Sequence, residues 1–192
     1  MRLLAMAMGT SLLVAACGGA AQPSPSPTAA ATTAAPATTA PATPAPTPAT
    51  QVTFTAELKT ENEVPPISNE EMSGSGMATV TFDLTRSATG AITAATASFE
   101  IVLSGFPTST MINVGHIHEA EAGANGGVVV GFKTDGANPI ALTTGGTTLT
   151  YADITVDPAL AQEILDDPDG YYVNVHSAAN PGGVVRGQLT TQ

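Results

Sequence analysis

Apolar and polar residues alternate with a period of two along most of the chain from residue 51 to residue 192. This pattern is typical of strands with one buried face, because successive side chains of a strand point to opposite faces. Glycine, proline, asparagine and aspartate lie between the alternating runs, as they do in antiparallel β-sandwiches and barrels. The runs that predict strands cover residues 52–58, 78–84, 98–103, 111–118, 128–132, 147–155, 171–176 and 184–189.

One segment departs from this alternation and predicts a short helix. Asp157 and Pro158 suit the N-cap and the first turn of a helix that continues over residues 159–165. Pro168 follows closely and ends it. The sequence therefore predicts an all-β antiparallel sandwich or barrel with one short helix.

The first 16 residues have the features of a lipoprotein signal peptide. Arg2 supplies a positive charge, and residues 3–16 form an uncharged apolar run that is too short to span a bilayer. Val14-Ala15-Ala16-Cys17 resembles a bacterial lipobox. By that resemblance Cys17 carries a lipid that anchors the protein to the outer face of the cell membrane or cell envelope. The alternatives are a plain secretory peptide with a chance cysteine, or a short membrane anchor.

Residues 17–50 predict a disordered tether. Proline, alanine and threonine dominate this segment, and residues 18–50 contain no charged side chain. Such a composition cannot bury a core. We therefore divide the chain into a signal peptide (1–16), a tether (17–50) and one β domain (51–192), whose length suits a single domain.

The predicted mature chain is strongly acidic. Without residues 1–16 it has four Lys or Arg residues against sixteen Asp or Glu residues, a net charge of −12 with neutral histidine. This charge argues against nucleic acid or an anionic lipid surface as a partner. The only membrane contact that the sequence predicts is the lipid on Cys17.

All three histidines lie in two short motifs, one around His116 and His118 and the other ending at His176. A His-x-His pair on a strand puts both imidazoles on one face, and a third imidazole from a neighbouring strand completes a set of three nitrogens. Such a set suits Cu(II) or Zn(II). Glu119, Glu121 or Asn174 are the candidate partners that hold the imidazoles in one tautomer.

A structural role is the alternative for the same residues. In that case the histidines hydrogen-bond to loops at the end of the barrel, and Arg186 pairs with a carboxylate. Strict alternation also places His116 and His118 on the face of Ile112 and Val114. If that face is the core, the imidazoles point inward unless Gly115 makes a bulge.

Several motifs together resemble the CHRD domain, which is named after chordin. The resemblance covers about residues 52–190 and implies an extracellular, immunoglobulin-like β-barrel. Its departures are Val184-Val185 and the acidic Glu119-Ala120-Glu121. The motifs that carry it are Asn62–Pro66, Gly74–Gly76, His116–His118 with Gly123 and Asn125-Gly126, Tyr172–Ser177, and Pro181–Leu189.

The sequence favours a non-catalytic surface binding or structural module on a tether. It contains no Gly-x-Ser-x-Gly elbow, phosphate-binding loop or His-Glu-x-x-His motif. The alternative function is a copper- or zinc-binding, redox-active protein that uses the three histidines.

Overall fold

The structure is a computed structural model that describes residues 47–192. The predicted signal peptide, Cys17 and the tether as far as residue 46 lie outside the described residues. Strand β1 (Thr47–Lys59) begins four residues before the predicted start of the domain at Gln51.

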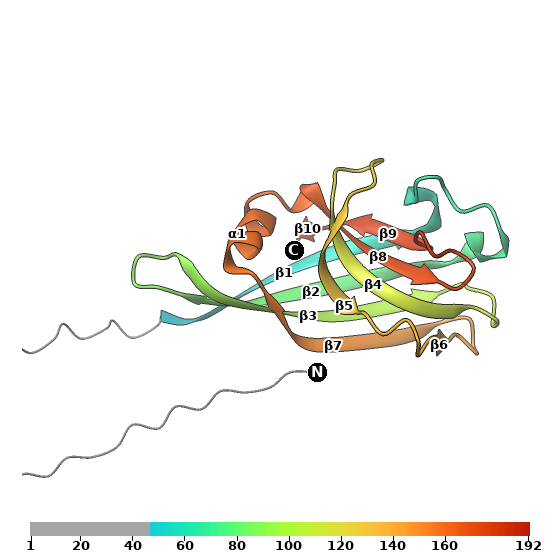
Figure 1. Ribbon diagram of the computed structural model, residues 1–192, viewed down its shortest axis with the longest axis horizontal. Coiled ribbons are helices and arrows are strands. Elements are labelled where there is room, and N and C mark those ends of the chain that lie inside the picture. The colour runs from blue at the N-terminus through green and yellow to red at the C-terminus, as the bar shows by residue number, and fades with distance from the viewer. Residues whose placement is uncertain (1–46) are drawn as a thin grey trace, which may run out of the picture. The chain divides into compact units, whose positions relative to one another are not determined.

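The strands form one antiparallel sheet in the order β5-β4-β8-β9-β1-β2-β3-β7, which confirms the predicted fold class (Figure 1). Two short strands lie off this path: β6 (Ile140–Ala141) pairs with β4, and β10 (Thr190–Thr191) pairs with β1. The remaining strands are β2 (Ser75–Arg86), β3 (Ile92–Ser104), β4 (Met111–Glu119), β5 (Gly127–Lys133), β7 (Thr147–Val156), β8 (Tyr171–Ser177) and β9 (Val185–Gln188).

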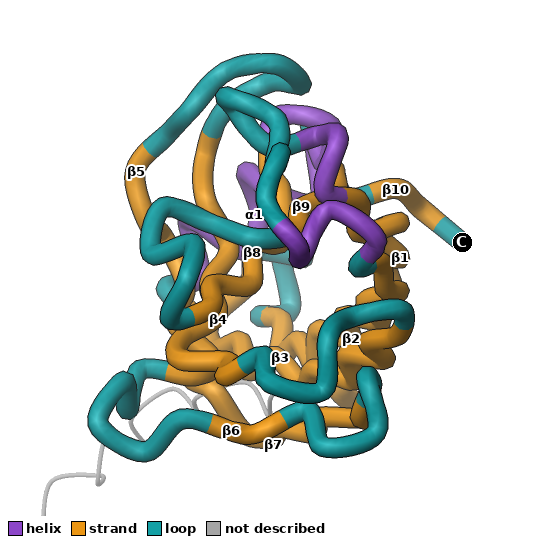
Figure 2. Tube along the Cα trace, turned by 90° about the vertical axis from the view of Figure 1, so that its right-hand side faces the viewer, coloured by secondary structure: helices purple, strands orange, loops and turns teal. Residues whose placement is uncertain are grey.

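Aromatic side chains bring the two ends of the sheet together. Phe132 of β5 stacks on Phe99 of β3 with ring centroids 4.5 Å apart, and it approaches Tyr151 of β7 at 5.6 Å. Figure 2 looks along the strands and shows them surrounding a common interior. The sheet is therefore a nearly closed barrel whose last gap is filled by side-chain packing.

The barrel interior holds the apolar residues that the alternation marks as buried. Phe54, Phe82 and Ile101 are fully buried there, together with Val173 and Val175 of β8. Burial of these side chains is the main stabilising term of the fold, at about 1.5–3 kcal/mol for each large side chain.

The predicted helix is present as α1 (Pro158–Asp166). Asp157 caps it, because its side chain accepts hydrogen bonds from the backbone N–H groups of Ala159 and Leu160. Ala161 and Ile164 bury one face of the helix in the core. The short 3₁₀ helices are η1 (Thr60–Asn62), η2 (Glu70–Ser73) and η3 (Pro168–Gly170).

No helix among residues 47–192 is long and apolar enough to cross a membrane.

A second buried layer lies outside the barrel and is polar. Every residue of β8 is buried, including those that point away from the barrel interior. Two segments cover this outer face, residues 60–73 and residues 120–126. Ser177 at the end of β8 donates to the Glu71 carboxylate at 2.5 Å, and Asn125 donates to the Val64 carbonyl at 2.9 Å. This polar layer contains all three histidines.

Candidate metal centre

His116 and His118 belong to the outer layer because β4 is irregular. Ile112 is buried in the core, but the pairing of β4 with β8 shifts its register between Ile112 and Val114. The shift reverses the faces, so that Ile117 fills the core while its two histidine neighbours face outward. The pairing of β4 with β5 has a second shift, between Gly115 and His116.

Gly115 has a packing role at this irregular position. A Cβ atom added there would lie only 2.2 Å from Cε2 of Phe132. The glycine therefore leaves room for the phenylalanine that closes the barrel.

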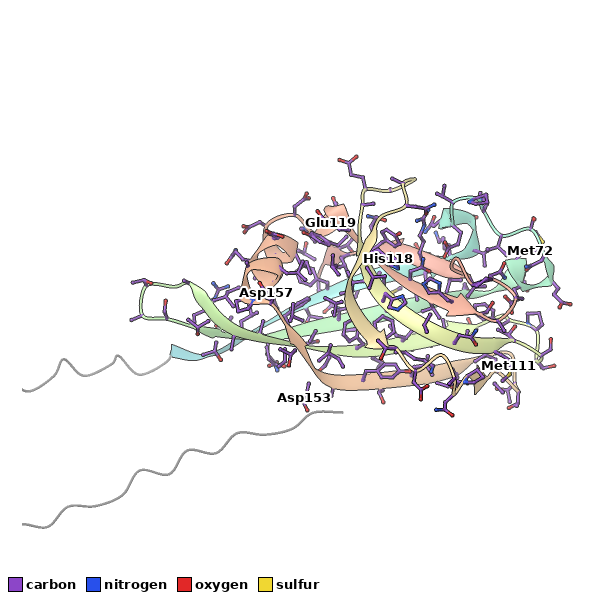
Figure 3. The ribbon with its side chains drawn as sticks, viewed as in Figure 1. Met72, Met111, His118, Glu119, Asp153 and Asp157 are labelled. Carbon is purple, nitrogen blue, oxygen red and sulfur yellow. The ribbon has the colours of Figure 1, made fainter. Side chains whose placement is uncertain are left out.

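The three imidazoles converge on one another. His116 lies opposite Asn174 in the pairing of β4 with β8, and His176 lies opposite Val114 on the same outer face. The ring centroids of His116 and His176 are 5.1 Å apart, and that of His118 is 5.6 Å from His116 and 6.0 Å from His176. One donor atom from each ring lies within 4.8 Å of the other two. Figure 3 shows His118 within this part of the fold.

Backbone carbonyls hold two of the rings in a defined tautomer. His118 Nδ1 donates to the carbonyl of Gly126 at 3.0 Å, and His176 Nδ1 donates to the carbonyl of Pro181 at 3.0 Å. Both Nε2 atoms therefore carry a lone pair. His118 Nε2 is buried and has no hydrogen-bond partner among the described residues.

Burial lowers the pKa of all three imidazoles. The pKa of His116 falls to about 4, first because of burial and then because of positive charge on His176 and His118. The pKa values of His118 and His176 are also lowered by burial, which outweighs the hydrogen bonds to their carbonyl partners. The imidazoles are therefore neutral at neutral pH, which is the form that binds a metal.

The spacing of the nitrogens suits a single ion. His116 Nδ1 and His176 Nε2 are 3.4 Å apart, close to the separation of about 3.4 Å between two ligands of a tetrahedral ion with metal–nitrogen bonds of about 2.05 Å. Two nitrogens on one ion can be at most about 4.1 Å apart at that bond length. A pair at the limit of 4.8 Å for this group would have to approach by about 0.7 Å to reach this maximum and by about 1.4 Å to reach the tetrahedral spacing.

Of the predicted partners of the histidines, Asn174 is the one that lies buried beside them. Glu119 and Glu121 are exposed, and Asn174 is buried between His116 and Arg186 in the register of the sheet. The atoms that accept hydrogen bonds from the imidazoles are backbone carbonyls, and no side-chain motif in the sequence shows which carbonyls these are.

Sequence reasoning missed Tyr172. Its ring stacks on His118 at 4.9 Å, and its hydroxyl accepts from the N–H of Gly126 at 3.3 Å. Its place opposite His118, which follows from register, could not be read from the sequence.

Arg186 forms a buried cluster beside the histidines. It lies over the ring of Tyr172 at 4.8 Å and donates to the carbonyls of Asn62 at 2.6 Å and Ala124 at 2.9 Å. Its nearest carboxylate is Glu63, at 3.8 Å between Nε and Oε2. Arg186 therefore ties both covering segments to β9.

Glu63 is poorly solvated in this cluster. It is 4% exposed, and its Oε1 has no hydrogen-bond partner among the described residues. Burial raises the pKa of Glu63 to about 7, against the opposing effect of Arg186. In the sequence, this residue lies in Asn62–Pro66, one of the motifs that resemble the CHRD domain.

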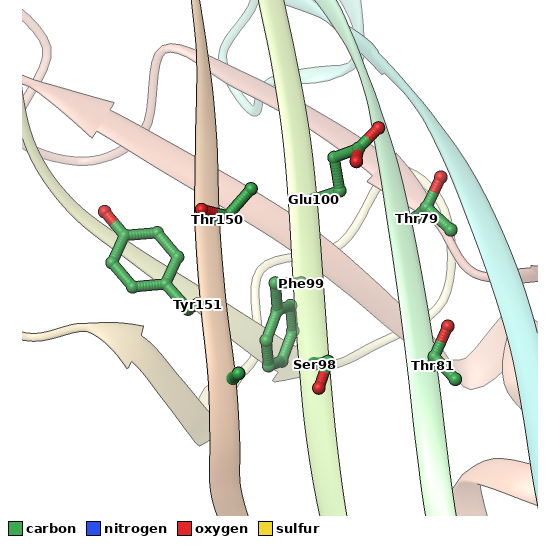
Figure 4. Close-up of a pocket in the computed structure, with 8 residues that line it drawn as sticks. Thr79, Thr81, Ser98, Phe99, Glu100, Thr150 and Tyr151 are labelled. Atoms are coloured by element: carbon green, nitrogen blue, oxygen red, sulfur yellow. The ribbon is translucent and has the colours of Figure 1, made fainter.

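A separate pocket lies on the outer face of β2, β3 and β7 (Figure 4). Hydroxyl groups line much of it, and none of the candidate metal ligands does. Its lining consists of Thr79, Thr81, Ser98, Phe99, Glu100, Thr150, Tyr151 and Ala152.

The comparisons with known proteins identify one family. The family model of the CHRD domain matches residues 54–189, which include all three histidines, Arg186 and Glu63. No curated protein and no solved structure matches the chain. The family match covers more than half of the sequence and nearly all of the described residues, and so this chain belongs to the CHRD domain family.

Proposed function

We propose that this protein is an exported lipoprotein whose CHRD domain binds one copper or zinc ion through His116, His118 and His176. Three neutral imidazoles are a donor set that both ions accept. The proposal describes a binding module and assigns no reaction to it, in keeping with a non-catalytic CHRD domain.

The observation that carries the proposal is the Nε2 atom of His118. It is buried without a hydrogen-bond partner in the described part of the chain, while a carbonyl holds Nδ1 of the same ring. An unsatisfied buried polar atom costs about 1–3 kcal/mol. A metal ion between the three rings removes that cost by accepting the lone pair.

The structural alternative accounts for less of this geometry. Hydrogen bonds from His118 and His176 to carbonyls do support the covering loops. A hydrogen bond between His116 Nδ1 and His176 Nε2, at 3.4 Å, accounts for the approach of those two rings, but none of these bonds explains the Nε2 atom of His118.

Metal content tests the proposal directly. The full chain carrying Cys17→Ser has no thiol, so any tightly bound ion must use other ligands. We expect one Cu(II) or Zn(II) per chain by elemental analysis after exchange against a weak chelator. We also expect unfolding to shift to higher temperature when metal is present. A chain that retains no ion and is not stabilised by either metal contradicts the proposal.

The lipid anchor rests on the sequence around Cys17. With fatty-acid labelling, we expect the original chain to incorporate label and to fractionate with membranes. The Cys17→Ser chain, processed in parallel, should do neither, because a serine hydroxyl does not replace the acceptor thiol. Membrane association of the unlabelled Cys17→Ser chain would show that another segment is the anchor.

A further inference from the structure

The group of candidate ligands in residues 47–192 contains three imidazoles and no carboxylate or thiol. Structural zinc sites are closed by four protein ligands, whereas sites with three protein ligands keep a position for water or another small molecule. An ion bound here, if the proposed function is correct, therefore has an incomplete protein shell.

The least covered side of the group is at His116. His118 and His176 are buried, but His116 is only half-buried. In the pairing of β4 with β5, His116 lies opposite Gly131, which has no side chain. A Cβ atom added at Gly131 would lie 3.6 Å from Cδ2 of His116 and 2.7 Å from the Thr134 methyl carbon. The Thr134 methyl carbon therefore occupies the space that a side chain at Gly131 would take, and solvent reaches the group through the exposed part of His116.

The charge of the centre favours an anion in the open position. Neutral imidazoles leave a divalent ion with its full positive charge, and the candidate ligand group supplies no carboxylate to offset it. The buried guanidinium of Arg186 adds positive charge nearby, because it lies over the Tyr172 ring that stacks on His118. In a partly buried site these charges are weakly screened.

We infer that the metal bound by His116, His118 and His176 keeps one coordination position for an exchangeable small anion, on the side where His116 is exposed. The inference deepens the proposed metal binding and depends on it. Such a centre can exchange its fourth ligand, whereas a purely structural ion is closed by four protein ligands.

Azide is the probe for this position. The full chain carrying Cys17→Ser is loaded with one equivalent of Cu(II), and azide is titrated while absorption and electron paramagnetic resonance are recorded. We expect a saturable azide-to-copper charge-transfer band and a changed copper spectrum, with one azide per copper. If copper is bound but its spectrum is unaffected by azide, the coordination is closed and the inference is wrong. If the chain binds neither Cu(II) nor Zn(II), the proposed function itself fails.

Discussion

Replacing His118 by alanine is expected to abolish stoichiometric binding of Cu(II) or Zn(II) and to leave the β fold in place. The substitution removes the one imidazole nitrogen that is buried without a partner among the described residues. Loss of a direct ligand should weaken binding by more than the 10- to 100-fold that is typical of loss of a supporting residue. Calorimetric titration measures the affinity, and circular dichroism checks the fold.

Tyr172→Phe is the control for this experiment. It removes the hydroxyl that accepts from Gly126 but keeps all three imidazoles and the ring that stacks on His118. We expect it to retain one metal ion per chain. If wild-type stability is the same with and without metal, and His118→Ala costs about 1–3 kcal/mol through lost hydrogen bonds, the histidines are structural.

Replacing Arg186 by methionine should lower the free energy of unfolding by about 3–5 kcal/mol at pH 8. The substitution leaves the Glu63 carboxylate buried without its cation and frees the carbonyls of Asn62 and Ala124. The pKa of Glu63 is raised from 4.5 to about 7 in the folded chain, so folding favours its protonated form. The contribution of the Glu63 carboxyl group to the free energy of unfolding is therefore greatest at low pH and is lost as the pH rises through about 7. We expect Arg186→Met to cost less at pH 5 than at pH 8, measured by denaturant unfolding.

Two further variants isolate the buried pair. Glu63→Gln in the Arg186→Met background should recover part of the loss at pH 8 and little at pH 5, because the amide is always neutral. Arg86→Met is the matched control, because Arg86 makes a hydrogen bond to the Gly90 carbonyl on the protein surface. This substitution should lower the free energy of unfolding by less than about 1 kcal/mol. A cost of Arg186→Met that is equal at both pH values would contradict a role for the Glu63 charge.

The placement of the residues on strands and on one helix followed from local pattern. Alternation identified the runs that became the long strands, and Asp157 and Pro158 identified the start of α1. These features depend on neighbours in the chain, so the sequence carries them directly. Between β8 and β9 lie Pro181-Gly182-Gly183, residues typical of a turn, and the antiparallel pairing of the two strands puts Asn174 opposite Arg186.

The supporting groups of the candidate centre could not be predicted in the same way. His118 is held by the carbonyl of Gly126 and the ring of Tyr172, and His176 by the carbonyl of Pro181. A backbone carbonyl is present at every residue, so no residue type marks the one that accepts. The burial of Glu63 could not be predicted either. Its contact with Arg186 of β9 joins residues that are more than a hundred positions apart in the chain.

From the alternation of side chains alone, we can predict that His116 and His118 share a face and that a third imidazole stands on another strand. Whether that face is the barrel interior or the outer face depends on how the strands pair. Period two relates the side chains within a strand, but one extra residue in a bulge reverses their direction, and such a bulge between Ile112 and Val114 turns the pair outward. Pairing of β4 with β8 then brings His176 beside His116 from sixty residues away, because register is set by contacts across the sheet.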